Sequence, residues 1–96
     1  MFFKKKDITM EYAKDKLLSR INIMNPKIKE NSEKRLYLSI FIKGRFVEIF
    51  LTEFSKKSVT LDIIDSFGFI SIPRKTFTQK KEFEEFIRTV VMQKLN

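Results

Sequence analysis

The clearest pattern in this chain is an alternation of aliphatic and other side chains with a period of two residues. It predicts β-strands over residues 35–43, 45–54 and 58–63, because successive side chains of a strand point to opposite faces. A fourth strand is predicted over Phe67–Ile72. Pro73 is expected to close the sheet, since proline has no N–H to donate to a ladder.

Two segments instead have apolar residues at helical spacing. A first helix is predicted after Asp7, a suitable N-cap, and it should stop before Asn25-Pro26. Residues Lys27–Lys34 are expected to be a polar connection. Thr78 is a plausible N-cap for a second helix, whose apolar residues form one continuous face. That face consists of Phe83, Phe86, Ile87, Val90, Val91 and Leu95.

These elements predict an α+β fold in the order helix, four strands, helix. The aliphatic side of the strands should pack against the C-terminal helix, and this layer should provide most of the driving force for folding. Residues 7–96 are interpreted as a single domain, and residues 1–6 as a basic N-terminal arm. That arm contains Phe2, Phe3 and three lysines.

The second side of the predicted strands is unusual, because it carries aromatic residues where an antiparallel sheet is normally polar. Its rings are Tyr37, Phe41, Phe46, Phe50 and Phe54, with Arg35, Lys43 and Arg45 nearby. Such rings can stack on the bases of single-stranded nucleic acid while cations hold the phosphates. Alternatively, the N-terminal helix or a second copy of the chain covers them as a further core layer.

Composition narrows the possible functions. The 96 residues include no Cys and no His, and the net charge is +8. Most nucleophile–base pairs and transition-metal sites are thereby excluded, so we expect no enzyme, no cofactor and no metal. The positive charge favours polyanionic partners. Lys43-Gly44-Arg45 and Lys56-Lys57 are predicted to form turns that reach phosphates, or ordinary solvated turns. We also expect a cytoplasmic protein with no membrane span.

Residues 34–95 resemble the repeat of the PUR family, the Pur-alpha-type proteins that bind single-stranded nucleic acid. The similarity lies in Lys34-Arg35-Leu36-Tyr37-Leu38, in Lys43-Gly44-Arg45-Phe46 and in Phe83-Glu84-Glu85-Phe86. It implies a curved four-stranded antiparallel sheet with a C-terminal helix, homodimerisation through the helices, and binding of purine-rich single strands. Tyr37, Lys43, Arg45, Phe46 and Lys57 would then contact the ligand.

The sequence therefore favours a non-enzymatic, homodimeric protein that binds single-stranded DNA or RNA. The expected contact residues are Arg35, Tyr37, Phe41, Lys43, Arg45, Phe46, Phe50, Lys56 and Lys57. The alternative hypothesis is an adaptor or membrane-surface module, because the end of the chain also resembles bacterial pleckstrin-homology-like domains. In that case the arm Phe2–Lys6 would contact the membrane.

Overall fold

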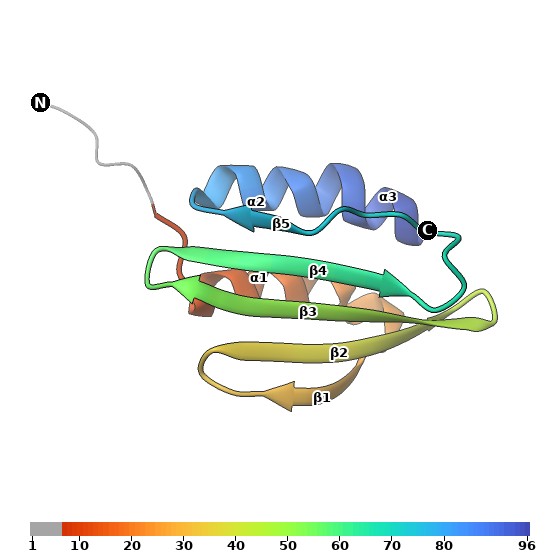
Figure 1. The fold of residues 1–96 in the computed structure, drawn as a ribbon. Helices are drawn as coiled ribbons and strands as arrows, with labels where there is room; N and C mark the ends of the chain where they lie inside the picture. The colour runs from red at the N-terminus through yellow and green to blue at the C-terminus, as the bar shows by residue number, and fades with distance from the viewer. Residues whose placement is uncertain (1–6) are drawn as a thin grey trace, which may run out of the picture.

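The structure is an α+β fold built on one five-stranded antiparallel sheet in the order β1-β2-β3-β4-β5 (Figure 1). This computed structural model describes residues 7–96. Its elements are α1 (Met10–Ile21), the 3₁₀ turn η1 (Asn22–Met24), β1 (Lys27–Asn31), β2 (Arg35–Ile42), β3 (Arg45–Ser55), β4 (Ser58–Asp65), β5 (Lys75–Phe77), α2 (Lys80–Phe86), the π-helical turn η2 (Ile87–Val91) and α3 (Met92–Leu95).

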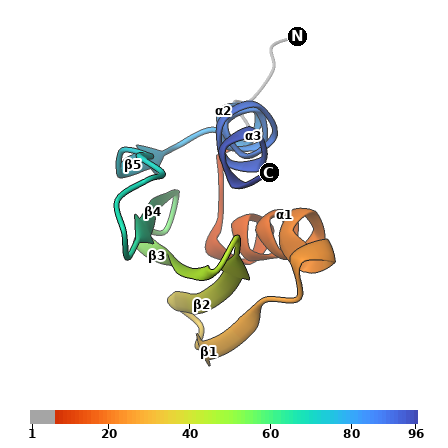
Figure 2. The same cartoon turned by 90° about the vertical axis from the view of Figure 1, so that its right-hand side faces the viewer.

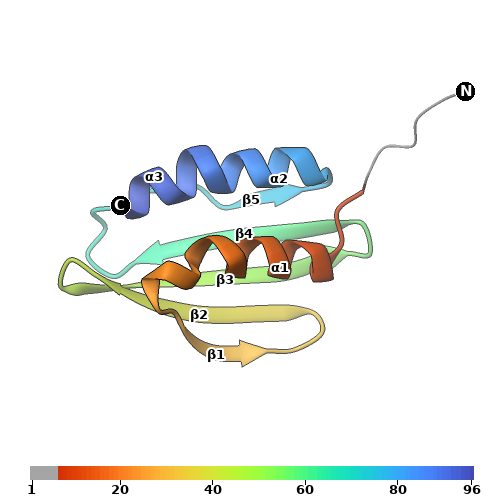
Figure 3. The same cartoon turned by 180° about the vertical axis from the view of Figure 1, so that it is seen from behind.

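Both helical segments lie on the same face of the sheet, which curves around them (Figure 2). The view from behind shows α1 lying across β3 and the C-terminal helical segment running above β4 and β5 (Figure 3). The predicted aliphatic residues of β2, β3 and β4 point into this layer and are almost completely buried; they are Leu36, Leu38, Ile40, Val47, Ile49, Leu51, Val59, Leu61 and Ile63. At about 1.5 to 3 kcal/mol for each fully buried large side chain, this layer is the main source of stability. The predicted aliphatic core is confirmed.

The first helix begins two residues later than predicted. Thr9 is its N-cap, and the Thr9 hydroxyl accepts a hydrogen bond from the main-chain N–H of Tyr12. Asp7 instead forms an isolated bridge with Gln79. The helical region ends at Asn25, which adopts a left-handed conformation directly before Pro26, so the predicted end is correct. Thr9 competes well with Asp7 because both side chains are good N-caps.

The predicted polar connection over residues 27–34 contains a strand. β1 (Lys27–Asn31) pairs with β2 and forms one edge of the sheet. All five of its residues are exposed, and its register shifts between Ile28 and Glu30. A short edge strand that contains lysines and a bulge is protected from pairing with other chains. Because both of its faces are exposed, it shows no alternation of apolar and polar residues by which it could be predicted. The sheet therefore has five strands, and the prediction of four is wrong.

The predicted fourth strand over Phe67–Ile72 is also wrong. These residues form a loop, and the last strand, β5, lies beyond Pro73 at residues 75–77. The cause is Asp65, whose carboxylate accepts hydrogen bonds from the main-chain N–H groups of Phe67 and Ile70. Gly68 adopts a φ of 73°, which suits glycine far better than other residues. The local hydrogen bonds turn the chain before it can extend.

The C-terminal helical segment starts after Gln79, one residue later than the predicted Thr78 cap. Its buried residues are Phe83, Ile87, Val91 and Leu95. They pack into the same core as the sheet of their own chain, and the Phe83 ring meets the Phe77 ring of β5 edge-on at 5.3 Å between centroids. The apolar face of this helix is thus covered without a second copy of the chain.

Candidate nucleic-acid interface

The side of the sheet turned away from the helices carries most of the predicted aromatic residues. We call it the outer face. Tyr37 of β2 lies opposite Phe50 of β3, and Phe41 lies opposite Phe46. The Tyr37 and Phe50 rings are stacked, with centroids 4.4 Å apart and planes at 14°. The Phe41 and Phe46 rings meet edge-on at 4.9 Å. The regular register of the β2–β3 hairpin therefore places two ring pairs along one surface.

The N-terminal helix does not cover this face, because α1 packs on the opposite side of the sheet (Figures 2 and 3). Phe46 is 56% exposed and Phe54 is 73% exposed, while the stacked Tyr37 and Phe50 are half-buried against each other. Exposed rings of this size are costly in water and commonly mark a contact surface. One of the two alternatives for covering the rings, the chain's own helix, is thereby removed.

Charged side chains stand among the rings of the outer face. The amine of Lys29 lies 5.5 Å from the centroid of the Tyr37 ring and 3.9 Å from the Glu48 carboxylate. The guanidinium of Arg35 lies 5.4 Å from the Phe50 ring, and its Nε lies 3.6 Å from a Glu30 oxygen. These ion pairs are largely exposed, and such pairs contribute at most about 1 kcal/mol. An incoming anion can therefore replace the carboxylates at low cost.

Two hollows lie on the outer face. One of about 510 Å³ runs along β3 and β4 and has Phe50, Phe54, Arg35, Arg74 and Asp62 in its wall. Asp62 makes no hydrogen bond or ion pair with any residue in the described part of the chain. Its carboxylate shares this hollow with two phenylalanines and two arginines.

The second hollow measures about 340 Å³ and lies nearer the β2–β3 turn. Phe46, Lys29 and Glu48 are among its lining residues. The Tyr37 hydroxyl donates a hydrogen bond to Glu48. This bond, together with burial and the negative charge of Glu48, raises the pKa of Tyr37 above its ordinary value. The phenol therefore stays protonated as a donor, and Glu48 is held at a defined place on the surface.

The predicted basic turns lie at opposite ends of the sheet. Lys43 and Gly44 form the β2–β3 turn with φ angles of 52° and 81°, as expected for a tight reversal containing glycine. Lys43 is exposed. Lys56 and Lys57 form the β3–β4 turn, where the Lys57 amine lies 3.6 Å from Asp7. The two turns are thus separated by the full length of β3 and flank the aromatic rings at either end.

Arg45 is separated from the other predicted contact residues. It lies on the helix side of the sheet, where its Nε donates a hydrogen bond of 2.8 Å to Asp65. Its side chain is only 10% exposed, and the carboxylate is fully buried. Although burial alone would raise the pKa of Asp65, main-chain hydrogen bonds and Arg45 lower it below its ordinary value. Arg45 is therefore committed to the fold and is poorly placed to meet a phosphate.

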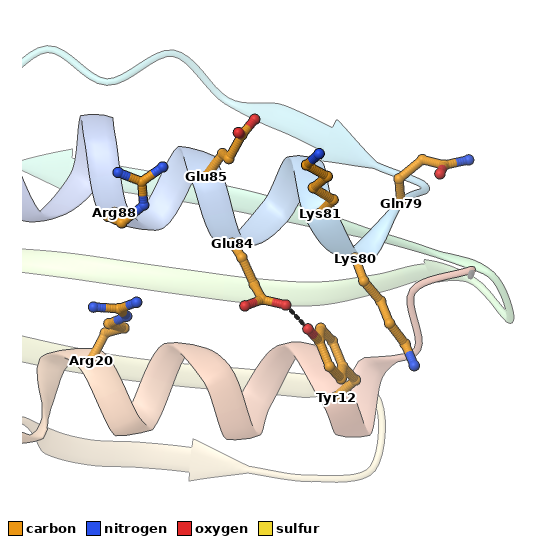
Figure 4. Close-up of a pocket in the computed structure, with 8 residues that line it drawn as sticks. All are labelled: Tyr12, Arg20, Gln79, Lys80, Lys81, Glu84, Glu85 and Arg88. Carbon is orange, nitrogen blue, oxygen red and sulfur yellow. Dashed lines mark hydrogen bonds between the residues drawn. The ribbon is translucent and has the colours of Figure 1, made fainter. Parts of the chain in front are cut away.

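A further hollow, of about 670 Å³, is a groove between α1 and α2 on the other side of the molecule (Figure 4). The Tyr12 hydroxyl donates a hydrogen bond across it to Glu84, and the Lys80 amine lies 4.6 Å from the Tyr12 ring centroid. Arg20 and Arg88 stand farther along it. These contacts join the two helices, and among the described residues Tyr12 is the one aromatic side chain that lines the groove, with the amines of Lys16 and Lys80 over its ring.

Comparisons of the chain with protein-family models, with curated proteins and with solved structures found no match. The similarity to the PUR repeat therefore stays a prediction from the sequence. In residues 7–96 no three Asp or Glu side chains come together as metal ligands. None of the described helices has the length and apolar character needed to cross a bilayer.

Several residues of the outer face were not predicted as contacts. Lys29 was missed because β1 was interpreted as a connection, and Arg74 because it follows the proline expected to end the sheet. Glu48 and Asp62 were not among the expected contacts, which were all aromatic or basic residues. For Phe54 the signal was present, since it shares the even-numbered face of β3 with Phe46 and Phe50.

Proposed function

We propose that this protein binds single-stranded DNA or RNA on the outer face of its sheet, without catalysing a reaction. Bases stack on the rings of Tyr37, Phe50 and Phe46. Arg35 and Lys29, which already lie beside these rings, contact the phosphates. The observation that carries the proposal is the uncovered aromatic surface: both helices lie on the other side of the sheet, and Phe41, Phe46 and Phe54 are exposed beside the half-buried pair of Tyr37 and Phe50.

The carboxylates of the outer face favour a single strand over a duplex. Glu48 and Asp62 are acceptors only, and they stand where bases rather than phosphates would lie. Carboxylates accept hydrogen bonds from the exposed N–H groups of unpaired bases. A duplex turns its phosphates outward, so the same carboxylates would repel it. Phosphates of a single strand can follow the rims, where Lys29, Arg35 and Lys43 stand.

Fluorescence anisotropy with labelled oligonucleotides tests this proposal. The protein should bind single strands in the submicromolar to micromolar range, bind duplexes more weakly, and lose affinity as salt rises. Because stacking contributes about 1 to 3 kcal/mol per base, Phe46→Ala should weaken binding by about 5- to 150-fold. Phe69→Ala, which removes a more exposed ring (77% against 56%) from outside the outer face, is the control and should bind like the wild type.

Two results would reject the proposal. One is the absence of binding, or binding that does not change with salt. The other is equal loss in the Phe46→Ala and Phe69→Ala variants, which would mean that any exposed ring serves. Homodimerisation, which the PUR resemblance implies, remains a separate prediction. Its measurement is the solution mass across a concentration series, with and without oligonucleotide.

A further inference from the structure

The loop after β4 displays two phenylalanines at one end of the molecule. Phe67 is 65% exposed and Phe69 is 77% exposed. The loop that carries them is held firmly: the Asp65 carboxylate accepts hydrogen bonds from the main-chain N–H groups of Phe67 at 3.0 Å and Ile70 at 2.9 Å, and from the side-chain Nε of Arg45 at 2.8 Å. Because a buried ion pair holds the main chain, the two rings are kept in water rather than folded into the core.

Three segments meet at this end, which we call the tip. They are the β2–β3 turn, the loop over residues 66–74 and the end of α3 (Figures 1 and 3). Figure 2 views the tip end-on. The Lys94 amine donates a hydrogen bond to the carbonyl of Ser71, and the Lys43 amine donates one to the main-chain oxygen of Asn96. The two lysines therefore join the segments into one surface.

The tip is basic and has almost no acidic side chains. Residues 36–47, 66–81 and 86–96 contain no Asp or Glu, while Lys43 and Lys94 each keep further donors for a ligand. The carboxylate of Asp65 is buried and paired with Arg45. In contrast, the outer face carries Glu30, Glu48 and Asp62. An anionic surface that approaches end-on therefore meets exposed rings and amines without meeting an exposed acidic side chain.

We infer that the tip docks on the surface of an anionic lipid bilayer. Phe67 and Phe69 enter the boundary between headgroups and acyl chains, and Lys43 and Lys94 contact the lipid phosphates. The two rings are tilted by 48° with centroids 6.3 Å apart, so they form a wedge rather than a flat stacking surface. Rings that enter a bilayer must protrude but need not lie in one plane, and exposed rings at the same end of the molecule as lysines are suited to this.

This site differs from the membrane contact suggested by the sequence. That contact involved the arm Phe2–Lys6, which lies outside the described residues. Asp7, the first described residue, lies 3.6 Å from Lys57 of the β3–β4 turn, at the far end of the sheet from the tip. The two sites can be separated experimentally.

Co-sedimentation with vesicles tests the inference, using the full chain. Wild-type protein should bind vesicles of phosphatidylcholine mixed with phosphatidylglycerol and not bind pure phosphatidylcholine. Loss of each ring should lower partitioning about tenfold, so Phe67→Ala/Phe69→Ala should be the most defective variant. Lys43→Ala should lower it about fivefold. The two phenylalanines can be replaced without losing the loop, because Asp65 binds its main chain.

The matched control is Phe54→Ala, which removes a ring of similar exposure from the other end of β3 and should leave vesicle binding unchanged. A second control replaces Lys4, Lys5 and Lys6 with serine. The inference is wrong if wild-type protein ignores anionic vesicles, or if binding disappears in this second control but survives in Phe67→Ala/Phe69→Ala. It is also wrong if the double variant loses oligonucleotide binding while no variant affects vesicle binding, since the tip would then belong to the nucleic-acid site.

Discussion

The same substitution on the two faces of the sheet should have very different effects on stability. Phe46 stands on the outer face and is 56% exposed, whereas Phe83 of α2 is fully buried in the helix-side core. Each ring also has one edge-on aromatic partner, Phe41 for Phe46 and Phe77 for Phe83. The two variants Phe46→Ala and Phe83→Ala therefore differ chiefly in how deeply the lost ring is buried.

The expected free energies follow from these surroundings. Slightly less than half of the Phe46 surface is buried, which corresponds to about 1 kcal/mol of the 1.5 to 3 kcal/mol for full burial. The lost contact with Phe41 adds about 0.5 to 1.5 kcal/mol, for a total of about 1.5 to 2.5 kcal/mol. Phe83→Ala should lower the free energy of unfolding by about 3 to 5 kcal/mol, because it also leaves a cavity.

Urea unfolding followed by far-ultraviolet circular dichroism measures both changes. The difference between the two variants should be about 2 kcal/mol, with unchanged dependence of the free energy on urea concentration. Equal losses would refute the assignment of an open and a buried face. A loss of 3 kcal/mol or more for Phe46→Ala that grows with protein concentration would show that a second copy of the chain covers the outer face.

Three further predictions concern charge. Arg35→Ala should make the plot of log affinity for a single strand against log salt shallower by about 0.7, and an unchanged slope would exclude a phosphate contact. Because the pKa of Asp65 is lowered from 3.8, its contribution to stability is present above that pH and is lost as the pH falls through the lowered pKa. Asp65→Asn should therefore unfold at lower urea concentration at neutral pH and lose less stability in acid, and parallel pH profiles would contradict this. The pKa of Tyr37 is raised from 10.0. The contribution of the protonated phenol to stability is therefore complete below pH 10.0 and is lost as the pH rises through the raised pKa. The difference in phenolate absorbance between wild type and Tyr37→Phe should have its midpoint above 10.0, and a lower midpoint would mean that Glu48 does not hold the phenol.

The parts of the fold that bury apolar residues could be predicted from the sequence. The alternation in β2, β3 and β4 and the apolar face of the C-terminal helix are direct consequences of packing against one core. The edge strands could not be predicted this way. β1 is fully exposed and β5 has only three residues, so neither shows a recognisable alternation of apolar and polar residues. Phe67–Ile72 has a strand-like composition, and the side chain of Asp65 overrides it.

The main difficulty in predicting the candidate site was to assign each residue to the correct face of the sheet. The odd-numbered residues of β3 share one face, so Arg45 lies on the side of Val47 and Ile49. The alternation that placed the rings correctly therefore also assigned Arg45 to the helix side. Proximity to the Lys43-Gly44 turn outweighed that signal in the prediction. The neighbours Lys29 and Asp62 depend instead on strand order and register, which bring residues distant in sequence together across the sheet.

The two surfaces differ in a way that bears on which anion each can accept. On the outer face, acidic and basic side chains surround one stacked and one edge-on ring pair, so a ligand must offer hydrogen-bond donors as well as phosphates, as unpaired bases do. At the tip the exposed side chains are rings and amines, so a ligand needs only negative charge and an apolar layer behind it, as a bilayer does. Because the helix-side core stabilises the fold without either surface, each surface can be altered separately. A nucleic-acid strand bound on the outer face would leave Phe67 and Phe69 free to contact a bilayer.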